Sequence, residues 1–429
     1  MPLNQISKQP MSPYQWLMVA ICFILNFNDG IDVLLVSFSS GAIITEWNLS
    51  KTEMGYIFSA GLAGMTLGAF LLAPKADIYG RRKIFLFSVG LIVIGMFGVA
   101  FCQSYKLMLV MRFLTGLGIG GILPTMAATA SEFSNDKFRD FNVGLVQAGW
   151  PIGAILTGIF AAKYIPEFGW KMAFMVGGFI ALAMWFLVLF FMTDSIGFVI
   201  HSGKMWALDE VNRLLKKMRM NIVSELPPQS GRSPNKGLRA ILRPEYKSNT
   251  IKIWLGAFFG FMTLYTLMSW VPNIAKESGM PFKLATYVGI ALNIGAAIGS
   301  ASIGAIGSKI GMRKVNLIYM LIAFFIMQAY AFSTLHTGLV FVLVLLIGIF
   351  VQGGFNAIWP TLSRLYDTGV RTTGVGYTVG IGRLGAILGP TLFGYFSDNG
   401  MSIQSLFVVF SIPLLLMGAF IWSLKSDKL

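Results

Sequence analysis

Long apolar segments alternate with short polar turns along most of this chain. Each segment holds roughly 18–25 residues, enough to cross a hydrocarbon core of ~30 Å as a single helix. The pattern predicts twelve membrane-spanning helices, over residues 16–38, 53–73, 84–102, 106–130, 142–162, 172–192, 251–273, 285–306, 315–333, 338–361, 373–395 and 402–424. The one long polar stretch, 193–250, contains Lys, Arg and Pro and is typical of a short surface helix followed by a flexible linker.

Composition favours an all-α integral membrane protein. Of the 429 residues, 55% are hydrophobic and 12% are charged, whereas a soluble domain carries about 25% charged residues. Both cysteines, Cys22 and Cys102, fall in apolar segments, which argues against a disulfide framework or a cysteine-bound metal. We expect no metal, no cofactor, a first helix that is retained rather than cleaved as a signal peptide, and a multi-pass location in the cell (inner or plasma) membrane.

The basic residues indicate the orientation. A net charge of +15 would suggest a nucleic-acid partner in a soluble protein, but most of the 33 Lys and Arg residues fall in alternate loops, the central loop and the two ends. Because cytoplasmic loops of membrane proteins are enriched in Lys and Arg, this bias places both termini in the cytoplasm. We therefore expect the lipid bilayer as a partner and no nucleic acid.

A weak internal repeat divides the chain. The sequences APKADIYGRRK at 73–83 and GAIGSKIGMRK at 304–314 each place a Gly three residues before the final Lys, in equivalent loops of two six-helix halves. Internal repeats of this kind are common in secondary transporters. The predicted organisation is an N-terminal half at 1–192, a cytoplasmic central loop at 193–250 and a C-terminal half at 251–429.

Two aspartates interrupt the first apolar segment. Asp29 and Asp32 are three residues apart and share one helix face, and each ionised carboxylate costs at least ~2.5 kcal/mol at membrane depth. That face must point into the protein or into a water-filled cavity, which makes a proton or substrate pathway the first hypothesis. Helix rise places Arg112 at a depth similar to that of Asp32, so a purely structural ion-pair network with Arg112 is the alternative.

The loop repeat and the two six-helix halves with a long central loop resemble the major facilitator superfamily of secondary transporters. The first loop matches the family signature at four gating positions, Asp77, Gly80, Arg81 and Arg82, followed by Lys83. The resemblance implies a monomer whose halves rock about a central site, with the Asp77 carboxylate bracing the cytoplasmic end of the eleventh helix. The simpler interpretation of the basic run is that it holds the loop and sets topology.

Three stretches resemble the aromatic acid:proton symporters within that superfamily. They are the D-G-x-D sequence Asp29-Gly30-Ile31-Asp32, the run RFLTGLGIGGILPTMAATASE from Arg112 to Glu132, and the segment Asn356–Pro390. The resemblance implies proton-coupled import of a small carboxylate, either an aromatic acid or a ring-cleavage product such as muconate. The candidate proton-coupling residues are Asp29, Asp32 and Glu132; the candidate substrate-binding residues are Arg383, Arg112, Trp150, Tyr265, Asn356 and Tyr377; Arg371 joins the gating residues.

These assignments leave alternatives. Arg383, near the membrane midplane by helix rise, offers fork-shaped recognition of a carboxylate, but it could equally bridge helices through backbone carbonyls. Six aromatic side chains could line a cavity for a flat ring: Phe27, Trp150, Tyr265, Trp270, Trp359 and Tyr377. Most aromatic residues of such a chain, however, serve packing or anchor it at the interface. The cargo could instead be a sugar, a nicotinate-like acid or an exported drug, and a membrane sensor that moves nothing is a further class. An enzyme is not expected, since no spanning segment carries a nucleophile elbow, phosphate loop or His/Glu metal cluster.

Overall fold

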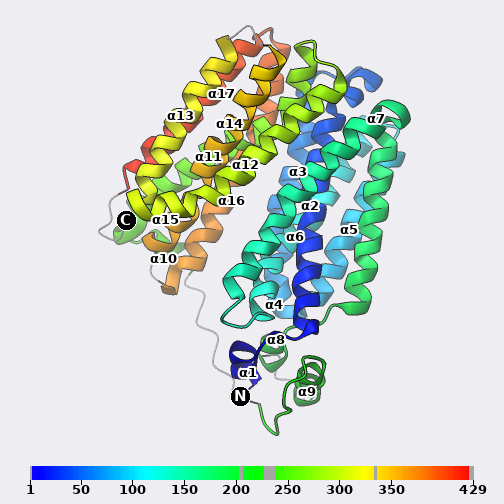
Figure 1. Ribbon diagram of the computed structural model, residues 1–429, viewed down its shortest axis with the longest axis vertical. Coiled ribbons are helices and arrows are strands. Elements are labelled where there is room, and N and C mark those ends of the chain that lie inside the picture. The colour runs from blue at the N-terminus through cyan, green and yellow to red at the C-terminus, as the bar shows by residue number, and fades with distance from the viewer. Residues whose placement is uncertain (1, 202–205, 227–236, 333–335, 367, 425–429) are drawn as a thin grey trace. The chain divides into compact units, whose positions relative to one another are not determined.

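The computed structural model describes residues 2–201, 206–226, 237–332, 336–366 and 368–424, and the regular structure in these ranges is helical (Figure 1). The long helices are α2 (Pro13–Trp47), α3 (Lys51–Leu71), α5 (Arg81–Phe101), α6 (Tyr105–Glu132), α7 (Arg139–Phe191), α11 (Pro244–Glu277), α12 (Phe282–Ile310), α13 (Met312–Phe332), α14 (Thr337–Asn356), α16 (Thr368–Asp398) and α17 (Ile403–Trp422). Shorter elements are α1 (Pro2–Lys8), η1 (Ala73–Lys75), α4 (Ala76–Tyr79), α8 (Ile196–His201), α9 (Ala207–Lys217), α10 (Gly237–Ile241) and α15 (Ile358–Leu365).

Eleven of the described helices are long and apolar enough to cross a membrane. The longest, α7, holds 53 residues and is interrupted at Gly169, whose φ of 77° and ψ of 166° are not helical. The parts before and after Gly169 are each long enough for a span, which takes ~20 residues. The expected segments 142–162 and 172–192 therefore lie on the two sides of this break.

Most helices extend beyond the predicted segments. The first runs over Pro13–Trp47 instead of 16–38, and the predicted segment 338–361 is divided into α14 and α15 at Ala357. Hydropathy detects the part of a helix that lies in hydrocarbon, whereas the backbone hydrogen bonds of the helix continue into the polar interface. The signals that set where a helix begins are local ones, such as the N-cap Ser104, whose hydroxyl accepts from Leu107 N–H at the start of α6.

Contacts divide the chain into two compact units. The first contains Met1–Asp32, Gly64–Gly153 and Phe174–Ser233, and the second contains Val33–Ala63, Ala154–Ala173 and Pro234–Leu429. Helix α2 passes from one unit to the other directly after Asp32. These packing units differ from the sequence halves 1–192 and 251–429, which stay a prediction.

Glycines set how closely the helices of the first unit approach. A Cβ added at Gly149 would lie 2.6 Å from the carbonyl oxygen of Phe23, and one at Gly153 would lie 2.1 Å from that of Phe27. Both distances are far inside van der Waals contact, so α7 can lie against the backbone of α2 only with glycine at these positions. Small residues play this role widely in membrane helices, and here they fix the part of α2 that carries the aspartates.

The two loop repeats adopt the same turn. Gly80 precedes α5 with φ 98° and ψ 147°, and Gly311 precedes α13 with φ 89° and ψ 140°. A positive φ is strained for residues with a Cβ, so both turns require glycine. The shared conformation confirms that the sequence repeat marks equivalent turns.

The small helices α1, α8 and α9 gather at one end of the first unit (Figure 1). The side chain of Gln5 bonds the backbone of Asn221 in both directions, at 3.0 Å each. The predicted surface helix corresponds to α9, which buries Val211, Leu214 and Leu215 on one face. Residues 227–236 of the predicted linker lie outside the described residues.

We predict that Gly153→Val prevents correct packing of α2 on α7. The added side chain meets the Phe27 carbonyl, so the yield of monodisperse protein after detergent extraction should fall strongly, as judged by size-exclusion chromatography. Gly144→Val on the same helix is the matched control, because a Cβ there meets nothing within 4 Å. Equal yields for the two variants would contradict the assigned packing.

Candidate functional site

Asp32 and Arg112 form a buried ion pair between α2 and α6. Arg112 donates from Nη1 to Oδ1 of Asp32 at 2.5 Å and from Nη2 to Oδ2 at 3.0 Å. Asp32 is fully buried and Arg112 is 3% exposed. This two-pronged geometry is the strongest that an arginine and a carboxylate make, and the expected pairing of the two residues is present.

The polar face of α2 continues on the N-terminal side of this pair. Asn26 donates to the carbonyl of Val146 on α7 at 2.8 Å, and Asn28 and Asp29 are 1% and 3% exposed. The face therefore points into the protein, as the cost of intramembrane charge requires. Arg112 Nε bonds no described residue, which leaves one donor of the guanidinium available inside the bundle.

Glu132 lies far from the two aspartates. It is the last residue of α6, twenty positions after Arg112, which is ~30 Å along a helix at 1.5 Å per residue. Its carboxylate forms an ion pair with Arg81, which also donates to Thr129 Oγ1 at 3.2 Å. Glu132 thus belongs with the loop between α4 and α5 instead of with Asp29 and Asp32.

Arg82, the next residue, contacts the end of α7 and the residues that follow it. Its backbone N–H donates to Asp194 Oδ1 at 2.9 Å, and its Nη2 donates to the Leu189 carbonyl at 2.7 Å. A Cβ on Gly80 would lie 2.8 Å from both carboxylate oxygens of Asp194, so this glycine is required by the turn and by the approach of the acid. The side chains of Asp77 and Arg371 lie outside the described residues.

Asp194 occupies the N-terminal end of α5, where a carboxylate complements exposed N–H groups and the helix dipole. Burial raises the pKa of the Asp194 carboxyl above its ordinary value, while hydrogen bonds from the backbone of Arg82 and Arg81 oppose the shift. Asp194 is not predicted from the sequence as a functional residue. An acid directly after an apolar segment looks like an ordinary loop residue, and only its partner distinguishes it.

Arg383 lies on α16 in the second unit and is 8% exposed. The preceding residue, Gly382, faces Phe261 of α11, since a Cβ there would lie 2.4 Å from that ring. Phe261 is stacked with Tyr265 at a centroid distance of 5.8 Å and meets Phe355 edge-on at 4.7 Å. An arginine therefore lies next in the chain to a residue that packs on a set of aromatic rings.

The aromatic set extends to α15. Phe355 meets Trp359 edge-on at 5.9 Å, so four rings from α11, α14 and α15 follow one another: Tyr265, Phe261, Phe355 and Trp359. Only the two partly exposed rings were singled out from sequence. Phe261 and Phe355 are indistinguishable from lipid-facing phenylalanines until the helices are assembled.

The remaining candidates are distributed over both units. Asn356 donates to Ser300 Oγ at 2.8 Å and accepts from Gln352 Nε2 at 3.1 Å, which joins α14 to α12. Tyr377 lies beside Trp254 at a centroid distance of 6.3 Å. Trp150 is half-buried on α7 in the first unit. The first unit thus carries the acids with Arg112, and the second carries Arg383, Tyr265, Asn356 and Tyr377.

Comparison with known proteins supplies the family. The model of the Major Facilitator Superfamily matches residues 18–390 and 253–428. A 4-hydroxybenzoate transporter of Pseudomonas aeruginosa is 29% identical over 413 residues, covering 95% of this chain and 92% of that protein. A gallate transporter of Pseudomonas putida is 27% identical over 415 residues, covering 95% and 91%. The crystal structure of a D-xylose–proton symporter has a TM-score of 0.78 at 15% identity, covering 97% of this chain and 99% of that one, which shows a shared fold.

We predict that Asp32→Asn destabilises the protein by ~3–5 kcal/mol, because Arg112 is left buried without its counter-charge. Thermal unfolding in detergent measures the loss. The double variant Asp32→Asn/Arg112→Gln should recover part of it, since neither member of the pair is then left charged without the other. Glu210→Gln is the matched control: its ion pair with Arg213 is partly exposed and should contribute less than ~1 kcal/mol. An Asp32→Asn variant as stable as this control would refute the prediction.

Asp194 should make stability depend on pH. Its pKa in the folded protein lies above the ordinary value of 3.8, so the folded state binds the proton more tightly than the unfolded chain. The stability from protonation is present below the unfolded pKa and is lost as the pH rises through the folded pKa. We predict that Asp194→Asn removes this loss of stability, so that the unfolding temperature changes less between about pH 4 and about pH 7 than it does in the parent.

Two further variants separate charge from capping. Asp194→Ala also removes the acceptor for the Arg82 N–H and should lower stability by ~1 kcal/mol across the whole range. Asp209→Asn, at an exposed acid of α9, should leave the profile parallel to that of the parent. A parallel profile for Asp194→Asn would contradict the assigned pKa shift.

Proposed function

The chain belongs to the Major Facilitator Superfamily and is a membrane transporter rather than an enzyme; from that premise we propose that it imports a small carboxylate together with a proton. The cargo is an aromatic acid or a ring-cleavage product such as muconate. The proposed topology has twelve spans, with α7 counted as two on either side of Gly169, and both termini in the cytoplasm. The working unit is a monomer in the cell membrane.

The buried acids of α2 carry the proton-coupling proposal. Asp29 and Asp32 are both buried in the protein, and both lie on α2, a helix long enough to span the membrane. Charges at such depth are retained in membrane proteins chiefly for ion or substrate pathways. Arg112 holds one of the two carboxylates in a fixed geometry, so we assign proton uptake and release to this pair of acids acting with Arg112. Glu132, paired with Arg81 at the end of α6, is assigned to the loop.

Arg383 and the neighbouring aromatic set support an aromatic carboxylate as cargo. A guanidinium binds a carboxylate through two parallel hydrogen bonds, and flat rings pack well against aromatic side chains. The two related transporters from Pseudomonas carry 4-hydroxybenzoate and gallate by name. We assign Arg383 to the carboxylate and the rings of Tyr265 and Trp359 to the cargo's apolar face.

The direct test is uptake into liposomes that contain the purified protein. We expect an inward proton gradient to drive accumulation of one labelled acid from a panel of benzoate, 4-hydroxybenzoate, protocatechuate, muconate and nicotinate, with a hexose as the neutral comparison. Arg383→Gln should weaken binding of that acid roughly 10–100-fold, because a hydrogen bond to a charged group contributes ~1.5–3 kcal/mol. Arg364→Gln, at an exposed arginine of α15, is the matched control.

Variants of the acids separate coupling from binding. In Asp29→Asn, gradient-driven accumulation should be lost while exchange of labelled for unlabelled acid at equal pH continues. Loss of both would assign Asp29 to substrate binding or folding instead of coupling. Uptake of the hexose alone, or of none of the panel, would leave the family membership in place and overturn the proposed cargo.

A further inference from the structure

A proline in α11 frees a backbone carbonyl that α2 then binds. Pro272 has no N–H, so the carbonyl of Met268, four residues earlier, lacks its helical partner. Ser37 of α2 donates its hydroxyl to this oxygen at 2.7 Å and lies 2.9 Å from the adjacent carbonyl of Ser269. Both ends of the contact are buried. The bond therefore satisfies a group that α11 cannot satisfy by itself.

A second proline contact joins α3 to α16. Pro390 interrupts α16, and Ser59 of α3 donates to the carbonyl of Ile387 in the interrupted turn and also bonds Thr391. The indole of Trp270 on α11 donates to the carbonyl of Pro390 at 3.0 Å, so the two proline-containing turns are themselves connected. Serines of α2 and α3 thus bind proline-interrupted turns of α11 and α16, respectively.

An acid completes the arrangement at the ends of the same helices. Asp398, the last residue of α16, accepts from the backbone N–H groups of Lys51 and Thr52 at 3.0 and 2.7 Å. These are the first N–H groups of α3, which have no partner within that helix, and the carboxylate also complements its dipole. The ammonium group of Lys51 bonds Glu277 at the end of α11 at 2.7 Å.

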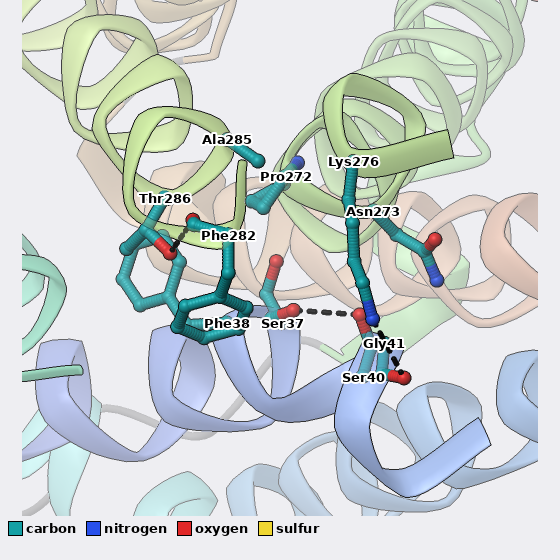
Figure 2. A pocket seen from close by; sticks show the side chains of 10 residues that line it. All are labelled: Ser37, Phe38, Ser40, Gly41, Pro272, Asn273, Lys276, Phe282, Ala285 and Thr286. Atoms are coloured by element: carbon teal, nitrogen blue, oxygen red, sulfur yellow. Dashed lines mark hydrogen bonds between the residues drawn. The ribbon is translucent and has the colours of Figure 1, made fainter. Parts of the chain in front are cut away.

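The interface beside Ser37 is incompletely packed (Figure 2). It encloses a cavity of about 10 Å³, close to the room needed for one water molecule. Lys276 reaches across from α11 to the carbonyl of Gly41 at 3.3 Å. The side-chain nitrogen of Asn273, a residue only 5% exposed, bonds none of the described residues. The cavity therefore places polar side chains with an unfilled bonding group beside the serine contact.

We propose that Ser37, Ser59 and Asp398 form a latch that holds the outer entrance of the transporter closed and that must be released for the outward-open state. The assignment of this end as the outer one rests on the proposed function and its topology. The bonds of Ser37 and Asp398 are made to backbone groups that the partner helix leaves free, and water that enters when the helices part can replace them. The latch therefore stabilises closure without preventing opening.

The test measures how readily a reporter cysteine in the closed interface reacts from outside. The reporter is Ser40→Cys, which lines the cavity and is buried, in a background with Cys22→Ser and Cys102→Ser. A membrane-impermeant maleimide is applied to intact cells without substrate. Because one hydrogen bond changes an equilibrium by about five-fold, Ser37→Ala/Ser59→Ala should raise the initial labelling rate at least about five-fold. Asp398→Ala should raise it independently.

Matched controls lie at the same end of the bundle. Among the described residues, the Ser278 hydroxyl bonds just the Ile274 carbonyl one turn earlier, at 2.9 Å, and Ser278→Ala removes it. Glu167→Ala removes an exposed acid near the Gly169 break. Both should label like the parent. Size-exclusion chromatography checks that each variant is folded. If the double serine variant does not fold, the labelling rate of Asp398→Ala alone tests the latch.

The labelling result is independent of the cargo. Faster labelling in the latch variants would support the latch even if no acid of the panel were transported. Rates equal to the parent in folded latch variants would overturn it even if acid uptake were demonstrated. Rapid and complete labelling of the parent would also overturn it, since the interface would then be open without any release.

Discussion

Water is absent from the hydrocarbon core, so every polar group placed there must find its partner within the protein. This constraint explains features that otherwise have little in common. Asp32 and Arg112 neutralise one another within the first unit, Asn26 bonds the carbonyl of Val146, and Ser37 binds the carbonyl that Pro272 leaves free. In each case a group that would be costly in lipid joins two helices, and these joints determine which helices lie together.

The same constraint limits what the sequence could reveal. The apolar segments, the repeated glycine turns and the depth match of Asp32 with Arg112 follow from composition, spacing and helix rise, and the structure contains all of them. Asp194, Ser59 and Asp398 could not be assigned in this way. A serine within an apolar segment or an acid at its edge has no distinctive pattern, because its role is set by a carbonyl or N–H group of a helix that is distant in sequence.

Close packing was predictable in kind but not in position. Small residues in membrane helices commonly mark close approach, yet only the assembled helices show that Gly153 faces the carbonyl of Phe27 while Gly144 faces open space. The aromatic set near Arg383 was likewise predictable only in part. Tyr265 and Trp359 were candidates from sequence, but the rings that connect them, Phe261 and Phe355, become recognisable only through their contacts.

The strengths of these interactions differ in a way that suits a transporter. The paired charges of Asp32 and Arg112 are fully desolvated, and separating them would cost several kcal/mol, so α2 and α6 should move together. The contacts of Ser37 and Ser59 are hydrogen bonds between neutral groups, each with a net contribution of ~1 kcal/mol. A few bonds of that size can hold one conformation in the majority while leaving the other accessible, since populations near one per cent correspond to only ~3 kcal/mol. Strong interactions thus join helices that move as a body, and weak interactions join helices that must part in each cycle.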